Sequence, residues 1–175
     1  MIKLVAKELR VSNPSKKELE KIKRREIYFI LDSVLDTYNV GGIFRLADAI
    51  GVKKVFLCGN TETPPNTRIK KASINTTEWV KWQYFVDAKI AISNLKSQVP
   101  EIQIIAVEQD PKSIPYTQID YSLPLAFVVG NETTGISQEI LKQCDNIAEI
   151  PMFGVNTSLN VIISLGIVSY HALEK

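Results

Sequence analysis

Short apolar runs alternate along the chain with segments whose apolar residues recur every three or four positions. The apolar runs predict β-strands, and the three- to four-residue spacing predicts helices. The predicted strands cover residues 27–31, 55–57, 80–86, 102–107, 125–129 and 146–150. The predicted helices cover residues 41–50, 87–98 and 137–144, and a last helix begins at residue 158. Strands that alternate with helices indicate an α/β fold, with a mostly parallel sheet that has helices on both faces.

The helix predicted over residues 41–50 has apolar side chains at positions 43, 46, 47 and 50, and Gly51 suits the residue just past its end. Long polar connections are predicted at residues 59–75 and 111–124. Nothing in the periodicity marks a boundary between two domains. We therefore expect one α/β domain over residues 26–175, preceded by an extension over residues 1–25.

The last predicted helix is apolar on nearly every side. It contains the longest apolar stretch of the chain, Leu159–Ala172, of about 14 residues, whereas a membrane span needs roughly 20. We therefore expect no contact with a membrane. A helix without a polar face is buried all round. Either a subunit interface or the chain's own core would have to cover it, and in a chain of this size the interface is favoured.

The composition is that of an ordinary globular protein, since 45% of the 175 residues are hydrophobic and 23% are charged. The N-terminus is too charged for a signal peptide. Cys58 and Cys144 show no metal-ligand spacing and suit small buried residues in a reducing cytosol. We therefore expect a cytoplasmic protein without a metal site.

The net charge of +2 conceals an uneven distribution. Residues 1–25 contain nine Lys and Arg against three Glu, and the rest of the chain contains twelve against sixteen acidic residues. Ser15 and Glu18 form the pattern of a capping box, which predicts a helix that continues to about Arg25. Such a basic extension suits a polyanion as partner, or it is simply a solvated helix face. Its exposed cations would include Lys21, Lys23, Arg24 and Arg25.

Three segments together form a pattern that none of them has alone. The first is Asn39-Val-Gly-Gly-Ile-Phe-Arg45-Leu-Ala-Asp-Ala-Ile50. The second is Phe127-Val-Val-Gly130-Asn-Glu132-Thr-Thr-Gly135-Ile-Ser137. The third is Ile150-Pro-Met152-Phe-Gly154-Val-Asn-Thr-Ser158-Leu-Asn160-Val161. In this order they resemble the three motifs of the SpoU/TrmH family of RNA ribose methyltransferases, within the SPOUT superfamily.

The resemblance implies a fold, a cofactor and a partner. The family's catalytic domain is an α/β fold whose C-terminal part forms a deep trefoil knot, which here would lie within about residues 125–175. In the family the knot loops wrap S-adenosylmethionine, and homodimers pack around the last helix. Compact members modify transfer RNA. RNA is therefore the expected partner, with tRNA favoured over rRNA.

Donor binding needs backbone that can approach an adenosine closely, together with apolar surface. Gly130 and Gly135 permit such an approach, although in isolation an ordinary turn would be the favoured interpretation of both. Ile150 and Met152 supply apolar surface, and Ser158 or Thr157 is expected to cap the last helix. The residues expected to bind S-adenosylmethionine are Val107, Gly130, Asn131, Gly135, Ile150, Met152, Ser158 and Leu159.

Arg45 matches the arginine that the family is held to use in catalysis. A guanidinium is a poor base in water. We therefore expect Arg45 to bind the phosphate beside the target ribose and to stabilise the forming alkoxide, the alternative being an i,i+3 ion pair with Asp48. Asn39 would orient Arg45 or the ribose, and Glu132 would hold the arginine or accept a hydrogen bond. The expected catalytic set is Arg45, Asn39, Glu132, Ser158 and Asn160.

Two other functions fit the composition less well. A nucleotide-binding dehydrogenase would need Gly-x-Gly-x-x-Gly after a strand, and the glycines here do not match that spacing. A catalytically silent RNA-binding module would not need the catalytic set. If the chain binds RNA, the contacts are expected from the basic extension and from three residues in or beside the connection 59–75, namely Arg68, Lys70 and Lys71.

Overall fold

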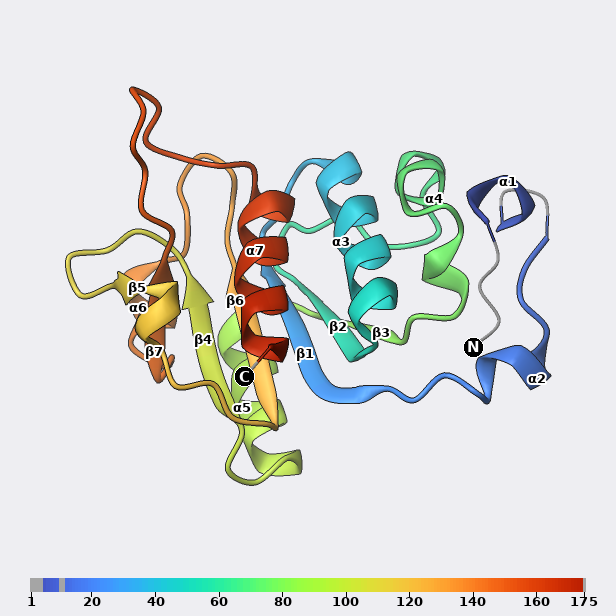
Figure 1. Cartoon of the computed structure of the whole chain (residues 1–175), viewed down its shortest axis with the longest axis horizontal. Coiled ribbons are helices and arrows are strands. Elements are labelled where there is room, and N and C mark those ends of the chain that lie inside the picture. The colour runs from blue at the N-terminus through green and yellow to red at the C-terminus, as the bar shows by residue number, and fades with distance from the viewer. Residues whose placement is uncertain (1–4, 10–11, 175) are drawn as a thin grey trace.

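The computed structural model describes residues 5–9 and 12–174 (Figure 1). Within this part of the chain, seven parallel strands form one sheet in the order β3-β2-β1-β6-β4-β7-β5. This arrangement confirms the predicted α/β fold with a parallel sheet. The strands are β1 Arg25–Asp32, β2 Val52–Cys58, β3 Trp82–Phe85, β4 Gln103–Val107, β5 Ile114–Pro115, β6 Leu125–Val129 and β7 Asn146–Glu149.

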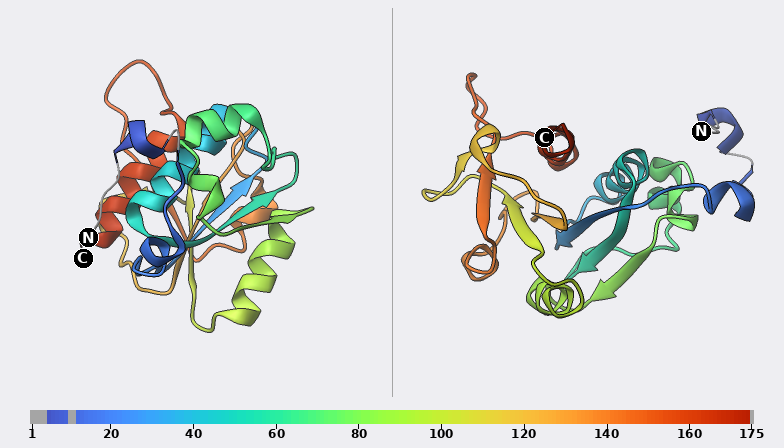
Figure 2. Two further views of the ribbon diagram at one scale, coloured as in Figure 1. Left: turned by 90° about the vertical axis from the view of Figure 1, so that its right-hand side faces the viewer. Right: turned by 60° about the horizontal axis from the view of Figure 1, so that its bottom comes forward.

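Helices lie on both faces of the sheet, as predicted. Helices α3, α4 and α7 lie on one side, and α5 and α6 lie on the other (Figure 2). The described α-helices are α1 Ala6–Leu9, α2 Lys16–Leu19, α3 Thr37–Ile50, α4 Thr67–Ser73, α5 Ala88–Gln98, α6 Gln138–Leu141 and α7 Val161–Leu173. Two short 3-10 helices cover Thr76–Glu78 (η1) and Tyr116–Gln118 (η2).

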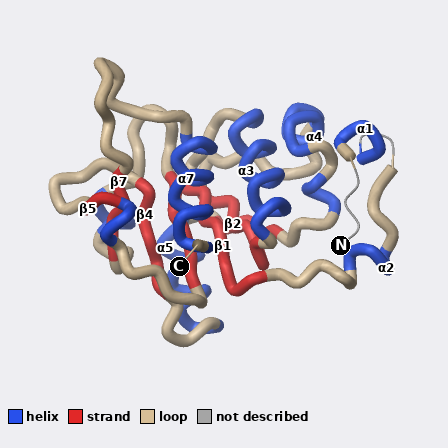
Figure 3. The backbone as a smooth tube through the Cα atoms, viewed as in Figure 1, coloured by secondary structure: helices blue, strands red, loops and turns tan. Residues whose placement is uncertain are grey.

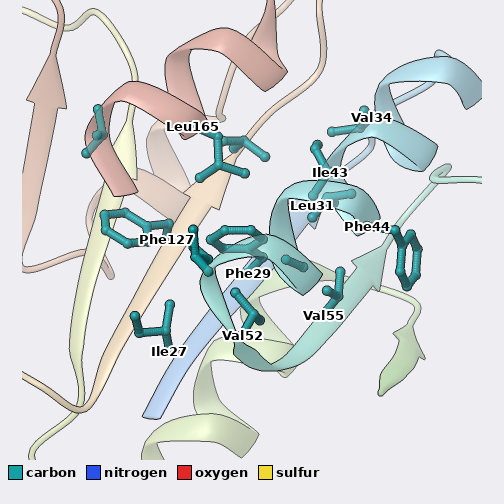
Figure 4. Packing of buried hydrophobic residues seen from close by; sticks show 14 of the residues in the cluster. Ile27, Phe29, Leu31, Val34, Ile43, Phe44, Val52, Val55, Phe127 and Leu165 are labelled. Carbon is teal, nitrogen blue, oxygen red and sulfur yellow. The ribbon is translucent and has the colours of Figure 1, made fainter. Parts of the chain in front are cut away.

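Strand β1 lies between β2 and β6 in the sheet, and its residues 27–31 are buried on both faces. Its odd-numbered residues, such as Phe29 and Leu31, pack in the core beneath α3 and α7, together with Phe127 and Leu165 (Figure 4). Its even-numbered residues, such as Ile30, pack against α5 and α6. A strand that is covered on both faces is apolar at every position. This is why a short apolar run predicted β1. The connection 111–124, which was expected to be a loop, contains the short strand β5, whose two residues form no such run.

Helix α3 starts one turn earlier than predicted. Asp36 caps it by accepting a hydrogen bond from the backbone N–H of Tyr38 at 2.8 Å. Gly51 ends it in the left-handed conformation, as expected. Asn39 therefore lies in the first turn of α3, and Arg45 lies two turns further on rather than near the start.

The structure corrects two further expectations. The N-terminal helix ends at Leu19 instead of Arg25, because the backbone N–H of Arg25 donates to the carbonyl of Gly51 at 2.7 Å and opens β1. The capping box of Ser15 and Glu18 is formed as predicted. The connection 59–75 was predicted as a loop, yet it contains α4, whose cap Asn66 accepts hydrogen bonds from the N–H groups of the first turn.

Helix α7 is not buried all round in the single chain. Leu165 and Val168 are fully buried, but Ile163 is 52% exposed and Tyr170 is 49% exposed. In the described part of the chain, no helix combines the length and apolarity that a membrane crossing requires. The segment between β7 and α7 projects beyond the sheet as a long loop (Figure 3). The trefoil knot remains a prediction.

Candidate active site

A cavity of about 550 Å³ lies where β4, β6 and β7 end. Ligands of open parallel sheets bind at the carboxyl ends of strands. Residues 156–160 of the loop before α7 form another wall of the cavity. The structure brings together in this lining every residue that was expected to bind the donor, namely Val107, Gly130, Asn131, Gly135, Ile150, Met152, Ser158 and Leu159.

Gly130 and Gly135 are required by the loop that they enclose. A side chain on Gly130 would come within 2.5 Å of the backbone of Gly135, and Gly135 has a φ of +66°. The side chain of Asn131 fixes the turn, because its Oδ1 accepts hydrogen bonds from the N–H groups of Thr133 and Thr134 at 2.9 and 3.0 Å. The close backbone approach expected here is therefore made within the loop itself.

A chain of hydrogen bonds joins the three motifs. The Nδ2 of Asn39 donates to Oε1 of Glu132 at 2.8 Å, and the Nδ2 of Asn160 donates to Oδ1 of Asn39 at 3.0 Å. Asn39 is only 5% exposed, so both ends of its amide are fixed by protein partners. Residues that are 93 and 121 positions apart in sequence are thus connected through one side chain.

The Glu132 carboxylate is bound to the N-terminus of α3 rather than to Arg45. Besides Asn39, it accepts hydrogen bonds from the backbone N–H groups of Leu35 and Asp36, each at 3.0 Å. Partial desolvation is the largest single influence and raises the pKa of Glu132, but these hydrogen bonds together outweigh it and leave the pKa below its ordinary value. Glu132 is therefore an ionised positioning group and a poor proton acceptor.

Asn160 caps α7, which corrects the expectation that Ser158 or Thr157 does so. Its Oδ1 accepts a hydrogen bond from the backbone N–H of Ile162 at 2.9 Å. The same amide donates to Asn39, so Asn160 fixes the start of α7 relative to α3. Ser158 lies in the exposed loop before the helix and lines the cavity.

Arg45 is exposed on α3 and does not line the cavity. Within the described residues its side chain makes no hydrogen bond or ion pair. The alternative pairing with Asp48 is not formed, because Asp48 accepts hydrogen bonds from Arg24 at 3.2 Å and from the indole of Trp79 at 2.8 Å. The guanidinium of Arg45 is therefore available to a partner from outside the chain.

The cavity lining also includes Glu108 and Gln109, which the sequence analysis did not name. Glu108 accepts a hydrogen bond from the backbone N–H of Ile136 at 2.9 Å, and Gln109 donates to the carbonyl of Thr157 at 2.7 Å. These bonds connect the end of β4 to the other two cavity loops. Their position directly after a predicted strand, where ligands of parallel sheets bind, was the signal that could have identified them.

The predicted RNA-binding residues occupy two separate regions. Lys21, Lys23 and Arg25 are exposed in the N-terminal extension, although not on a common helix, and residues 1–4 and 10–11 of that extension lie outside the described part. Arg24 is held by Asp48 and its side chain is only 21% exposed. The second region is the outer face of α4, where the exposed cations are Arg68, Lys70 and Lys71.

The two cysteines lie away from the cavity and are both free. Burial raises the pKa of the Cys58 thiol to about 12, with Asp32 and Asp87 adding to the effect. Burial likewise raises the pKa of Cys144 to about 12. Thiols that remain protonated at neutral pH are neither nucleophiles nor metal ligands. The described residues contain no cluster of side chains suited to a metal ion.

Residues 26–170 match the SpoU rRNA Methylase family. The chain belongs to this family. It is 31% identical over 161 residues to the tRNA (guanosine(18)-2'-O)-methyltransferase of Aquifex aeolicus (strain VF5), which covers 90% of this chain and 72% of that protein. The solved A. aeolicus TrmH/SpoU tRNA modifying enzyme is 27% identical and has a TM-score of 0.78, over 97% of this chain and 81% of the other. The AdoMet-bound rRNA methyltransferase from Sinorhizobium meliloti is 28% identical with a TM-score of 0.78, over 95% of this chain and 59% of the other.

The cavity fits the methyl donor of this family. Its volume lies within the range of about 300–1,000 Å³ that is usual for small-molecule sites. Val107, Ile150, Met152 and Leu159 supply apolar surface for an adenosine, and the backbone around Gly130 supplies polar groups. S-adenosylmethionine is therefore the cofactor, as predicted.

Proposed function

We propose that this chain is an S-adenosylmethionine-dependent RNA methyltransferase that modifies a ribose 2′-hydroxyl. The observation that supports it best is the hydrogen-bond chain Glu132–Asn39–Asn160 beside the cavity. A structural turn would not need polar side chains from three distant segments to meet at one cavity. When bound, the cofactor supplies a methyl group that its sulfonium already activates, so the chain's residues need to position the donor and the ribose hydroxyl and to stabilise the alkoxide that forms as the hydroxyl proton passes to water.

Arg45 is proposed to act on the RNA rather than on the donor. Its exposed guanidinium can bind a phosphate through two parallel hydrogen bonds and place a positive charge near the forming alkoxide. Glu132 and Asn160 are proposed to fix Asn39, whose amide then orients the start of α3 and thereby Arg45. Ser158 is proposed to line the side of the cavity at which the ribose enters.

Transfer RNA is the leading substrate class and ribosomal RNA is second. The Aquifex relative is named for tRNA guanosine methylation, and a structural relative is named an rRNA methyltransferase. Exposed cations on the N-terminal extension and on α4 are proposed to contact RNA phosphates. An enzyme that acts on RNA and has two free cysteines also suits the cytoplasm.

A homodimer through α7 belongs to the same proposal. Ile163 and Tyr170 of α7 are 52% and 49% exposed, and Leu159 just before the helix is 38% exposed; such exposed apolar side chains are typical of a subunit interface. Gly42 of α3 packs against Ile162 of α7, so these two helices are neighbours. A second copy that covers α7 would therefore also lie near the exposed face of α3. We also propose a trefoil knot within about residues 125–175, which the likeness to a solved SpoU structure supports. A domain boundary near residue 26 is proposed as well, since the family match begins there.

The test is mass spectrometry of ribose-methylated nucleosides in total RNA from cells with and without this protein. We expect one 2′-O-methylnucleoside to disappear without the protein, to return with the wild-type chain, and not to return with Arg45→Ala. An unchanged set of ribose-methylated nucleosides in both tRNA and rRNA fractions would contradict the proposal.

A further inference from the structure

The donor cavity has an uneven charge. Among the described residues that line it, only Glu108 and Glu132 have ionisable side chains, and both are acidic. The lining includes no Lys, Arg or His. Whatever binds there therefore lies in a field that favours positive charge.

The two carboxylates are held in different ways. Glu132 is bound to the N-terminus of α3, which offsets part of its charge. Glu108 follows β4 directly and accepts two backbone hydrogen bonds, from Gln109 to Oε1 and from Ile136 to Oε2, each at 2.9 Å. No cationic side chain pairs with Glu108 among the described residues. Its carboxylate is therefore a fixed negative charge at the cavity wall.

We propose that Glu108 is a specificity-determining residue that makes the cavity prefer the cationic donor over its neutral product. This inference rests on the proposed function, because it assumes that S-adenosylmethionine and S-adenosylhomocysteine are the donor and product. The donor has a sulfonium, an ammonium and a carboxylate, and thus one net positive charge. The product lacks the sulfonium charge and is neutral overall. Glu108 therefore attracts the donor more strongly and assists exchange of product for donor after each turnover.

The volume of the cavity bounds the size of this effect. A compact space of 550 Å³ is about 10 Å across, so a bound cation lies within about 10 Å of the Glu108 carboxylate. Because the site is partly open to solvent, an effective dielectric constant of roughly 20–40 applies. At the full distance of about 10 Å, the attraction corresponds to a preference of about fourfold to fifteenfold for the donor, and a shorter distance makes the preference larger.

Isothermal calorimetry with both ligands tests the proposal on the purified protein. Glu108→Gln should weaken S-adenosylmethionine binding by at least about fourfold while S-adenosylhomocysteine binding changes by less than about twofold. Glu108→Asp retains the charge and should keep the wild-type ratio of the two affinities, even if the shorter side chain weakens both. Glu139→Gln, which removes one negative charge on α6 outside the donor cavity, should leave the ratio unchanged.

Two results would overturn the proposal. If Glu108→Gln keeps the wild-type ratio, or weakens both ligands equally, Glu108 anchors the loop at Ile136 without discriminating between them. If Glu108→Asp shifts the ratio as strongly as Glu108→Gln does, charge is not the cause. Failure of the wild-type protein to bind either ligand would instead contradict the proposed function, and the two failures are thus distinguishable.

Discussion

Replacing Asn39 by alanine removes the side chain that connects the three motifs. Two hydrogen bonds are lost, one to the charged Glu132 and one from Asn160. A hydrogen bond to a charged group contributes about 1.5–3 kcal/mol and a neutral one about 0.5–1.5 kcal/mol. Glu132 is exposed and keeps its two backbone hydrogen bonds, so water compensates part of the loss. We therefore expect Asn39→Ala to lower the free energy of unfolding by about 2 kcal/mol.

Asn39→Asp gives the same site a dependence on pH. It places a second carboxylate against Glu132, so one of the two pKa values rises in the folded variant. A carboxyl whose pKa is raised by folding binds protons more tightly in the native state, so the variant gains stability relative to wild type as pH falls. In the wild type the pKa of Glu132 is lowered, so its stabilisation is present above its ordinary value of 4.5 and is lost as pH falls through the native value.

Urea unfolding at pH 5 and pH 7.5 measures both effects. At pH 7.5 we expect Asn39→Asp to be less stable than Asn39→Ala, and at pH 5 we expect this difference to shrink. Asn60→Asp is a matched control, because Asn60 is exposed and its side chain has no hydrogen-bond partner in the described chain. A loss of less than about 0.5 kcal/mol in Asn39→Ala would refute the inference that this chain of hydrogen bonds stabilises the site.

Three other predictions concern RNA and assembly. Arg45→Ala should abolish methyl transfer while the affinity for S-adenosylhomocysteine stays within about threefold of wild type. Arg45→Lys should also be inactive, because an ammonium cannot form the two parallel hydrogen bonds of a planar guanidinium. Near-normal activity of Arg45→Lys would exclude bidentate phosphate binding. Ile163→Glu should convert a dimer to a monomer in sedimentation, and a monomeric wild-type protein at micromolar concentration would contradict the interface. The double variant Lys21→Gln, Lys23→Gln should weaken RNA binding without changing which nucleotide is methylated. The slope of log K against log salt concentration should become shallower by about 0.7–0.9 for each lost phosphate contact. An unaltered slope would show that these lysines are solvated and do not bind RNA.

The sequence predicted the layers of the fold because the sheet is buried on both faces. Each residue of β6, for example, is buried, and such a strand is a continuous apolar run that periodicity detects. Short polar helices gave no such signal. In helix α4, Ile69 is the one buried apolar residue, and most of its neighbours are polar. The start of this helix depends on the cap at Asn66.

That the expected donor residues would line one cavity was predictable, but the contacts of the site residues were not. Motif residues near strand ends converge because the carboxyl ends of parallel strands share one edge of the sheet. Sequence spacing cannot tell which acceptor a side chain chooses. Glu132 was expected to hold Arg45 or to accept a hydrogen bond, and it accepts hydrogen bonds from the N–H groups at the start of α3. Likewise Asp48 pairs with Arg24, which is far away in sequence.

The exposed face of α7 shows that a hydrophobic pattern does not reveal which chain covers a helix. The all-apolar pattern predicted burial, and a single chain leaves Ile163 and Tyr170 half exposed. A hydrophobic pattern reports the surface that is hidden in the working assembly, whether by the same chain or by a second one. The apolar pattern and the exposure in one chain are reconciled by the proposed homodimer.

The most direct test of the central proposal is transfer of a labelled methyl group in a purified system. The protein is incubated with methyl-labelled S-adenosylmethionine and unmodified tRNA or rRNA transcripts, and the digested RNA is analysed by mass spectrometry. We predict label on a ribose 2′-oxygen of one nucleotide for the wild-type protein and none for Arg45→Ala. Binding of the donor without transfer to any RNA would contradict the assignment and would instead identify the chain as a catalytically silent RNA-binding module.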